Sequence, residues 1–287
     1  MDGCNQEDLE HPVRFAGFVG RVEVSLHVCK GYNTLLYLLQ VSVGENMLKS
    51  AREQLRARTT PEQRQHILQR LRKLTRPAFL GTLRRTSPLS STWGYDRGTP
   101  VDRYYIERFL ARHRSDIGGR VLEVKDSHYT QRFGQGVERS DILDIDPANP
   151  NATIIADLAA ADGVPSDTFD CLVLTQTLQF IYDTRAAVGH IHRILKPGGV
   201  LLATMPVVSR IDRSLKSIDY WRFTPASCHQ LFAEEFGDEQ TTVYAYGSVL
   251  TGVAFLSGMA YEELSRRELD AHDEYFPVLV AVRAVKR

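Results

Sequence analysis

Residues 120–130 read RVLEVKDSHYT, and this stretch decides which fold the sequence favours. The apolar run VLEV is typical of the first strand of a nucleotide-binding α/β domain, where a glycine-rich turn follows the strand. The turn here contains no glycine, and the residues that stand in it are Lys125, Asp126, Ser127, His128 and Tyr129. Either a ligand is held without close approach of a glycine backbone, or the site has changed its use.

Length, composition and charge limit the possible classes of protein. The chain has 287 residues and is 43% hydrophobic, which is enough for one large core with an accessory segment. Its 35 basic and 35 acidic residues balance, so no overall charge attracts nucleic acid or an anionic membrane. The four scattered cysteines match neither a zinc site nor a disulfide scaffold, and no apolar run is long enough to span a bilayer. We expect a cytoplasmic protein without a metal, nucleic-acid or membrane partner.

Strand and helix patterns alternate from residue 102 onward. The predicted strands are VLEV, DILDID, FDCLVLTQTL, VLLATMP, TTVYAYG and PVLVAVRAVKR, and the predicted helices include DRYYIERFLARHRSDI, AAVGHIHRIL and VLTGVAFLSGMAYEELS. Such alternation favours a parallel sheet with helices on both faces. We expect DILDID and LVLTQTL to be neighbouring elements of this sheet.

Residues 1–91 have a different pattern and predict a mainly helical extension. RVEVSLHV favours a short strand, and YNTLLYLLQ through NMLKSAREQLRAR favours a helix. A second helix begins with Thr60 as cap and Pro61 at the first position, followed by apolar residues at helical spacing, namely Ile67, Leu68, Leu71 and Leu74. Eleven basic and two acidic residues between 49 and 85 predict a solvated or dimer-facing surface. The extension therefore predicts a possible homodimer or a lid over the active site.

In a sheet of this kind, the ligand lies beyond the carboxyl ends of the strands, beside the first strand. The turn after VLEV, the end of DILDID and the end of LVLTQTL meet there. An acidic residue at the second position accepts hydrogen bonds from the two hydroxyls of a ribose. Asp146, directly before Pro147, is the expected acceptor.

The motifs VLEV, DIDP, ADL, FDCLVLTQTL and LKPGGVLLATMP, in this order, resemble the class I S-adenosylmethionine-dependent methyltransferases over residues 92–287. WGYDRGTPVDRYYIERFL, SHYT and DYWRFT resemble a bacterial, type 11-like subgroup whose domains also occur beside glycosyltransferases. The resemblance implies a doubly wound, mostly parallel, seven-stranded Rossmann-like sheet, closed by an antiparallel strand in PVLVAVRAVKR. It also implies S-adenosyl-L-methionine as the cofactor.

The resemblance further assigns cofactor contacts. Glu123 and its turn would approach the methionine part, Asp157 with Leu158 would flank the adenine, and Thr175 with Gln176 would line the floor beneath the sulfonium. The full set of expected contacts is Glu123, Val124, Lys125, Asp126, Tyr129, Asp146, Pro147, Asp157, Leu158, Thr175 and Gln176.

Lys125 stands where the family has its first glycine, and its side chain hinders both close backbone approach and a positive φ. Two interpretations stay open. Lys125 pairs with the cofactor carboxylate while Asp126 faces the ammonium, or Lys125 points into solvent above an ordinary polar turn.

Candidate catalytic and acceptor residues lie around this turn. His128 is the candidate base for an oxygen acceptor, with a surface-loop histidine as the alternative, and Asp183 is a weaker candidate that equally suits a helix cap. The expected acceptor contacts are Trp93, Tyr95, Arg97, Tyr104, Tyr105, Asp219, Tyr220 and Arg222. We expect Trp221 and Phe223 to be buried rather than to touch a ligand.

Three functions follow from this sequence. The leading hypothesis is methylation of a small molecule, by O-methylation of a natural product or saccharide. The second is a methyltransferase-fold enzyme that now acts as a lyase or cyclase, because of Lys125. The third is a non-enzymatic binding protein, since fold alone does not determine function.

Overall fold

The computed structural model describes residues 86–287 and, before them, residues 23–25, 40–42, 59–61, 63, 64, 67, 81 and 84. The chain divides into two compact units, residues 1–81 and residues 82–287, and each is described by itself. The predicted boundary lay ten residues later, at residue 91. Residues 86–91 belong to the second unit because the amide of Leu89 donates to the carbonyl oxygen of Ser257 at 2.7 Å.

The first unit contains an antiparallel pair of strands, β1 (Glu23–Ser25) and β2 (Gln40–Ser42). β1 confirms the strand predicted in RVEVSLHV. β2 corrects the helix predicted through residues 40–42, because Val41 lies opposite Val24 in a ladder that a local helical pattern does not reveal. The predicted start of the second helix is confirmed, since the amide of Gln63 donates to Oγ1 of Thr60 at 3.2 Å. Leu68, Leu71 and Leu74 lie outside the described residues, as does nearly all of the basic segment.

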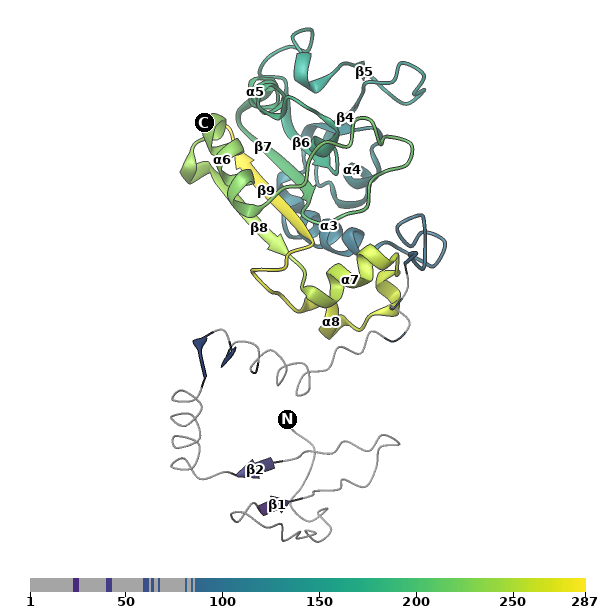
Figure 1. Cartoon of the computed structure of the whole chain (residues 1–287). Helices are drawn as coiled ribbons and strands as arrows, with labels where there is room; N and C mark the ends of the chain where they lie inside the picture. Colours follow the sequence, from purple (N-terminus) through teal and green to yellow (C-terminus); the bar gives the residue numbers. More distant parts are fainter. Residues whose placement is uncertain are drawn as a thin grey trace. The chain divides into compact units, whose positions relative to one another are not determined.

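The second unit is built on a seven-stranded sheet with the order β5-β4-β3-β6-β7-β9-β8 (Figure 1). The strands are β3 (Gly119–Val124), β4 (Val137–Asp144), β5 (Ile154–Ile155), β6 (Phe169–Thr175), β7 (Leu195–Pro206), β8 (Thr241–Tyr246) and β9 (Leu279–Val285). β9 runs antiparallel to both of its neighbours, and the other pairs are parallel. This confirms the doubly wound, mostly parallel sheet.

The neighbour relation expected between the DILDID and LVLTQTL strands is wrong. β4 and β6 lie on opposite sides of β3 and both pair with it. The reason is the order of the strands. From β3 the chain adds β4 and then β5 on one side, and it then returns to add β6 and β7 on the other side of β3. The topological switch point therefore lies between β3 and β6.

Helices cover both faces of the sheet. One face carries α3 (Val101–Arg112), α4 (His128–Phe133), α7 (Val249–Ser257) and α8 (Arg266–Asp270), and the other carries α5 (Thr184–Ile194) and α6 (Pro225–Phe236). Short 3₁₀ turns connect these elements, namely η3 (Arg114–Asp116), η4 (Leu158–Ala160), η5 (Leu178–Phe180), η6 (Asp238–Gln240) and η7 (Tyr261–Glu263). Successive strand residues alternate between the two layers, as Val121 and Leu122 do, so each face buries its own hydrophobic core.

One connection lacks the expected helix. β4 and β5 are parallel, yet residues 145–153 between them contain no helix. Two prolines in this segment, Pro147 and Pro150, oppose helix formation because proline removes a backbone donor and restricts the residue before it. The side of α4 next to β4 is therefore left uncovered by this connection.

Candidate functional site

The candidate site lies at the carboxyl ends of the strands that flank the switch point. The turn after β3 begins at Lys125, and the turn after β6 begins at Gln176. Both residues have positive φ, +75° for Lys125 and +50° for Gln176, although neither is glycine. Left-handed non-glycine residues persist only where surrounding contacts fix them, and they cluster at functional sites.

Hydrogen bonds hold Lys125 in the glycine-like conformation. Its amide donates to the carbonyl oxygen of Leu143, and its carbonyl oxygen accepts from Nδ2 of Asn149, both at 2.8 Å. The expectation that lysine would hinder a positive φ here is thus corrected. The tertiary contacts offset a cost of about 1–2 kcal/mol for a left-handed residue. The side chain of Lys125 is exposed.

Substitution of Lys125 by glycine should therefore not destabilise the protein. Glycine relieves the left-handed strain, while its extra freedom in the unfolded chain costs roughly 0.5–1 kcal/mol. We expect Lys125→Gly to leave the free energy of unfolding in urea unchanged or to raise it by up to about 1 kcal/mol. Lys216→Gly, at an exposed loop position without a positive φ, is the control and should lose stability. Equal losses in both variants would contradict the argument.

Gln176 and its hydrogen-bonding neighbour Thr204 each place a buried polar atom without a hydrogen-bond partner among the described residues beside the switch point. Its amide donates to the carbonyl oxygen of Thr204 at 2.9 Å, and its own carbonyl oxygen accepts from Nε2 of Gln179 at 2.8 Å. Nε2 of Gln176 and Oγ1 of Thr204 are buried without a partner among the described residues. Buried polar atoms of this kind suit a polar ligand, because leaving them unpaired costs free energy.

Two acidic residues follow the β4 strand. β4 ends at Asp144, so the strand predicted to reach Asp146 ends two residues earlier. Asp144 accepts from the amide of Asp146 at 3.0 Å and from Nδ2 of Asn149 at 2.7 Å. Asp146 is exposed and accepts from the amide of Ala148 at 2.9 Å, which engages one of its two oxygens.

Asp144 and Asn149 were not predicted from the sequence as residues that shape the site. Burial raises the pKa of Asp144, but hydrogen bonds from Asp146 and Asn149 outweigh burial and hold the pKa below its usual value. Asn149 donates to both Lys125 and Asp144, so it joins the turns after β3 and β4. The available signal was the position of Asp144 directly after the apolar pair Ile142-Leu143.

Glu123 fixes the first turn of α4. Its carboxylate accepts from the amides of Tyr129 at 3.0 Å and Thr130 at 2.7 Å, and the residue is 2% exposed. Burial raises the pKa of Glu123 despite these hydrogen bonds. The Glu123 carboxylate therefore fixes the orientation of the first turn of α4 relative to β3.

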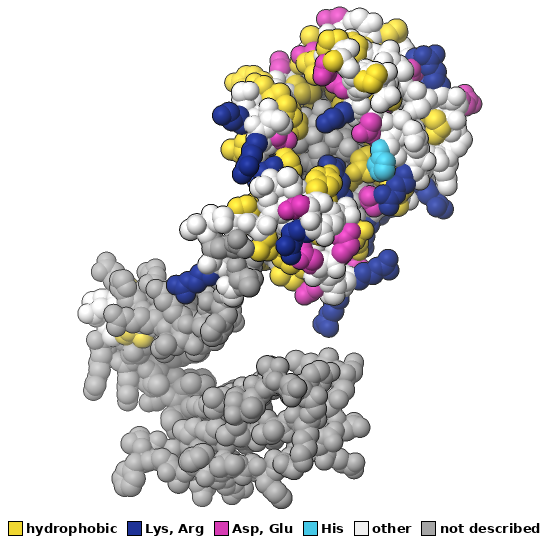
Figure 2. Space-filling view, turned by 90° about the vertical axis from the view of Figure 1, so that its right-hand side faces the viewer, with side chains coloured by type: hydrophobic (Ala, Val, Ile, Leu, Met, Phe, Trp, Pro, Cys, Tyr) yellow, Lys and Arg dark blue, Asp and Glu magenta, His cyan; other side chains and the backbone are white. Residues whose placement is uncertain are grey.

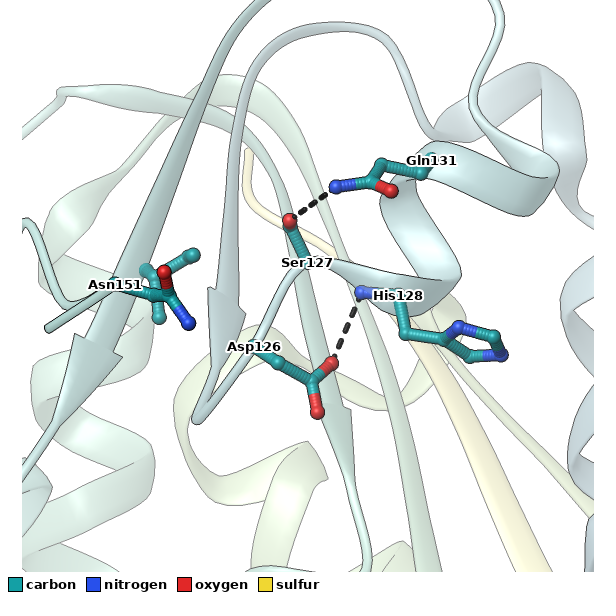
Figure 3. Close-up of a pocket in the computed structure, with 6 residues that line it drawn as sticks. Asp126, Ser127, His128, Gln131 and Asn151 are labelled. Atoms are coloured by element: carbon teal, nitrogen blue, oxygen red, sulfur yellow. Dashed lines mark hydrogen bonds between the residues drawn. The ribbon is translucent and has the colours of Figure 1, made fainter. Parts of the chain in front are cut away.

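A polar cavity of about 360 Å³ lies between α4 and β4 (Figure 3). It is lined by Asp126, Ser127, His128, Gln131, Ile142 and Asn151. Oδ1 of Asp126 accepts from the amide of His128 at 2.9 Å, and Nε2 of Gln131 donates to Oγ of Ser127 at 2.8 Å. The imidazole of His128 points away from Asn151 in Figure 3 and packs edge-on against the ring of Tyr129, with centroids 5.2 Å apart.

Residues expected at the adenine are partly engaged in the fold. Leu158 is 3% exposed and belongs to the core beneath α5. Asp157 caps η4, since its Oδ1 accepts from the amide of Ala159 at 2.9 Å. Val124 is the last residue of β3, and Thr175 is the last residue of β6. Pro147 is exposed and lies beyond the end of β4.

The residues expected at the acceptor fall into separate groups. Trp93 lies against the segment after β7, where the Arg210 guanidinium carbon is 3.6 Å from its ring centroid. Arg97, Tyr104 and Tyr105 contact the segment 262–270 instead. Arg97 pairs with Glu263, Tyr104 donates to Asp270, and Tyr105 is buried and donates to Leu269, as the hydrogen bonds show.

Asp219 and Arg222 hold the segment 207–222. Nη1 of Arg222 donates to Oδ1 of Asp219 at 2.5 Å, and Oδ2 of Asp219 accepts from the amide of Asp212 at 3.1 Å. Arg222 also donates to the carbonyl oxygen of Arg210 at 3.1 Å. Burial raises the pKa of Asp219, but the pairing with Arg222 outweighs it, so the pKa lies below its usual value.

Three aromatic residues, Tyr182, Tyr220 and Trp221, form an exposed group that we name the aromatic cluster. Their exposed fractions are 70%, 44% and 38%. The ring of Tyr182 lies 5.2 Å from that of Tyr220 and 5.7 Å from that of Trp221. The expected burial of Phe223 is confirmed at 6% exposure, whereas that of Trp221 is wrong.

Trp221 stays at the surface because its polar edge is satisfied there. Its Nε1 donates to the carbonyl oxygen of Ile181 at 3.0 Å. The amide of the neighbouring Tyr220 donates to the carbonyl oxygen of Gln179 at 2.9 Å. The aromatic cluster therefore joins the segments that follow β6 and β7. Asp183, next to the cluster, caps α5 by accepting from the amide of Ala186 at 3.0 Å.

Figure 2 shows one face of the unit formed by residues 82–287, which is hollowed, with hydrophobic, basic and acidic side chains mixed around the hollow. Within the part of the chain that the structure describes, no His, Cys, Asp and Glu side chains gather in a group of three or more that could hold a metal ion. The helices of that same part include none long and apolar enough to cross a membrane.

Several solved structures are similar to the chain. An S-adenosylmethionine-dependent methyltransferase from Mesorhizobium loti is 16% identical with a TM-score of 0.43, and the match covers 67% of this chain and 100% of that one. A second one from Archaeoglobus fulgidus is 13% identical with a TM-score of 0.43, covering 64% and 94%. A Haemonchus contortus phosphoethanolamine N-methyltransferase 2 with bound S-adenosylhomocysteine is 16% identical with a TM-score of 0.42, covering 62% and 52%.

No curated protein sequence matches the chain significantly. A family described as a methyltransferase domain matches residues 84–243, which is more than half of the chain and includes β3 to β7. The cofactor of the class I enzymes with this sheet is S-adenosylmethionine. The chain therefore belongs to the methyltransferase domain family, and its sheet is that of the class I S-adenosylmethionine-dependent methyltransferases.

Proposed function

We propose that the protein transfers a methyl group from S-adenosylmethionine to a hydroxyl group of a small molecule, with a saccharide or a ring-containing natural product as the acceptor. The observation that carries this proposal is the pair of left-handed residues, Lys125 and Gln176, on either side of the switch point. The turn after β3 has thus kept a glycine-like backbone without glycine, which argues for a retained cofactor site over a lost one.

Different residues around the switch point are proposed to contact different parts of the cofactor. When bound, the cofactor supplies an electrophilic methyl carbon. The turn at Lys125 and Asp126 receives the methionine part, Asp146 accepts from the ribose hydroxyls, and Asp157 with Leu158 borders the adenine. Gln176 and Thr175 form the floor, where the buried Nε2 of Gln176 lacks a protein partner among the described residues. These groups position the reactants, which is the main requirement of methyl transfer.

The aromatic cluster is the proposed acceptor platform. Its rings follow the carboxyl ends of β6 and β7, and hydrogen bonds to backbone carbonyls fix Tyr220 and Trp221. Exposed, rigid aromatic rings suit a sugar or planar ring, since they bury large apolar area at low entropic cost. His128 is the proposed acceptor of the hydroxyl proton. Trp93 and Tyr95 are proposed as further contacts to the methyl acceptor.

Asp146→Ala should weaken binding of S-adenosylhomocysteine at least about tenfold, because it removes an acceptor for charge-assisted bonds to two ribose hydroxyls. One Asp146 oxygen accepts from the amide of Ala148 and the other has no protein partner in the described part of the chain, whereas both Asp144 oxygens accept hydrogen bonds. Isothermal titration calorimetry measures the effect. Asp144→Asn is the comparison, and selective loss of binding in that variant, with Asp146→Ala unchanged, would assign the ribose to Asp144 instead.

Trp221→Ala should raise the acceptor KM by roughly tenfold and leave the affinity for S-adenosylhomocysteine within about twofold. The reason is that the cluster touches the acceptor and not the cofactor. Tyr275→Ala, at an aromatic residue that is 79% exposed outside the cluster, is the control. A screen of saccharides and phenolic compounds provides the acceptor. An equal loss of cofactor affinity in Trp221→Ala would count against a separate acceptor platform.

Calorimetry of the full chain with S-adenosylmethionine and S-adenosylhomocysteine tests the proposed function as a whole. Heat from both, with methyl transfer to an acceptor, supports it. Binding without transfer to any acceptor favours the lyase or cyclase alternative, and no heat from either favours a binding protein. The homodimer expected from residues 1–91 is a separate prediction, which the mass of the full chain in solution tests.

A further inference from the structure

We propose that Asp102 and Arg103, in the first turn of α3, hold the amino-acid end of the cofactor, with Arg103 on its carboxylate and Asp102 on its ammonium. This inference rests on the proposed function, because it assumes that S-adenosylmethionine lies at the switch point. It moves the ionic contacts away from Lys125 and Asp126, where the turn sequence had suggested them.

Arg103 is a half-buried cation held by neutral groups. Its Nε donates to the phenol oxygen of Tyr95 at 3.1 Å, and its Nη1 donates to that of Tyr129 at 3.3 Å. No carboxylate forms an ion pair with it in the described part of the chain, and its Nη2 has no protein partner there. A guanidinium oriented by two phenols keeps donors for an anion, and a carboxylate can accept two of them in parallel.

Asp102 supplies the opposite charge beside it. The residue is 8% exposed, and its Oδ1 is buried without a partner among the described residues. Burial raises the pKa of this carboxyl group and outweighs the opposing attraction of the neighbouring Arg103 guanidinium. Asp102 and Arg103 attract each other but form no direct ion-pair contact. Adjacent opposite charges of this kind suit a ligand that carries both, and an α-amino acid carries an ammonium and a carboxylate on one carbon.

The position of the pair fits the methionine end of the cofactor. Tyr129, which contacts Arg103, is the second residue of α4 and lies four residues after Lys125, where the turn that follows β3 begins. The amide of Tyr129 is bonded to the buried carboxylate of Glu123 at the end of β3. Arg103 therefore approaches the turn from the side of α3, while Lys125 on the turn itself is exposed.

The test compares two ligands that share the nucleoside. S-adenosylhomocysteine has the amino-acid end, and 5′-methylthioadenosine lacks it. By titration calorimetry on the full chain, Arg103→Ala should weaken S-adenosylhomocysteine at least about tenfold and change 5′-methylthioadenosine less than about twofold. Arg103→Lys should fall between, since it keeps the charge and loses the parallel donors. Asp102→Asn should show the same selectivity as Arg103→Ala.

Two arginines serve as controls. Arg108 lies on the same helix and pairs with Asp270 at the surface, so Arg108→Ala should affect neither ligand. Arg210 is a second cation without an ion pair among the described residues, stacked on Trp93, and Arg210→Ala should leave the ratio of the two affinities unchanged.

The proposal and the function on which it rests fail in different ways. If the wild-type protein binds neither ligand, the proposed function is wrong. If it binds both, the proposal is overturned by an unchanged affinity ratio in Arg103→Ala or Asp102→Asn, or by equal losses for the two ligands. A selective loss in Arg210→Ala, rather than in Arg103→Ala, also overturns it.

Discussion

Glu123→Ala should lower the free energy of unfolding by about 3–5 kcal/mol, since it leaves two buried amides without an acceptor at about 1–3 kcal/mol each and removes side-chain volume. The amides are those of Tyr129 and Thr130, which begin α4. Both tryptophans of the chain, Trp93 and Trp221, lie in the unit formed by residues 82–287. Urea unfolding followed by tryptophan fluorescence therefore reports on this unit.

Two further variants serve as comparisons for Glu123→Ala. Glu123→Gln keeps one acceptor oxygen and should lose an intermediate amount of stability. Glu138→Ala, at an exposed position of β4, should change stability by less than about 0.5 kcal/mol. A loss below about 1 kcal/mol in Glu123→Ala would mean that water or a rearranged α4 satisfies the two amides.

Arg222→Ala should cost about 3 kcal/mol at neutral pH, because it leaves the Asp219 carboxylate buried without its cation. The side chain of Asp219 is 3% exposed, and the pair connects residues 210 to 222. The same variant should free the segment that carries Tyr220 and Trp221, so limited proteolysis should cut there first. Arg185→Ala removes a surface pair with Glu234 and should cost less than about 0.5 kcal/mol.

The pH dependence of this effect has a definite sign. Burial pushes the pKa of Asp219 up and Arg222 pulls it further down, so the folded-state pKa lies below the unfolded value of about 3.9. The contribution of the pair is therefore complete above the unfolded pKa and is lost as the pH falls through the folded pKa. The stability difference between wild type and Arg222→Ala should shrink in that acid range. A difference that stays constant down to about pH 3 would contradict the role of the ion pair.

Much of the fold was predictable from local patterns. The alternation of VLEV, DILDID, LVLTQTL and VLLATMP with amphipathic helices predicted the layered sheet, because strand and helix periods depend on which side chains face the core. Thr60 and Pro61 predicted a helix start from two residues alone. The switch point beside β3 located the site, although the sequence paired β4 with β6 where the structure inserts β3 between them.

Tertiary structure decided how the site is built. A lone lysine predicts a hindered turn, yet Leu143 and Asn149 hold Lys125 at a φ of +75°. Asp219 and Arg222 matched acceptor contacts by residue type, but they pair with each other because the segment after β7 folds back on itself.

The same holds for the groups that a ligand would meet. Trp221 is exposed because a carbonyl from the segment after β6 satisfies its Nε1, and Arg103 meets two phenols from separate segments of the chain. By itself, the sequence determined six of the seven strands of the sheet, the helices α3, α5 and α7, and the edge of the sheet that carries the site. It did not predict the short strand β5 or the helices α4, α6 and α8. The environment of each polar group depends on partners brought together from distant segments, and no local period encodes those contacts.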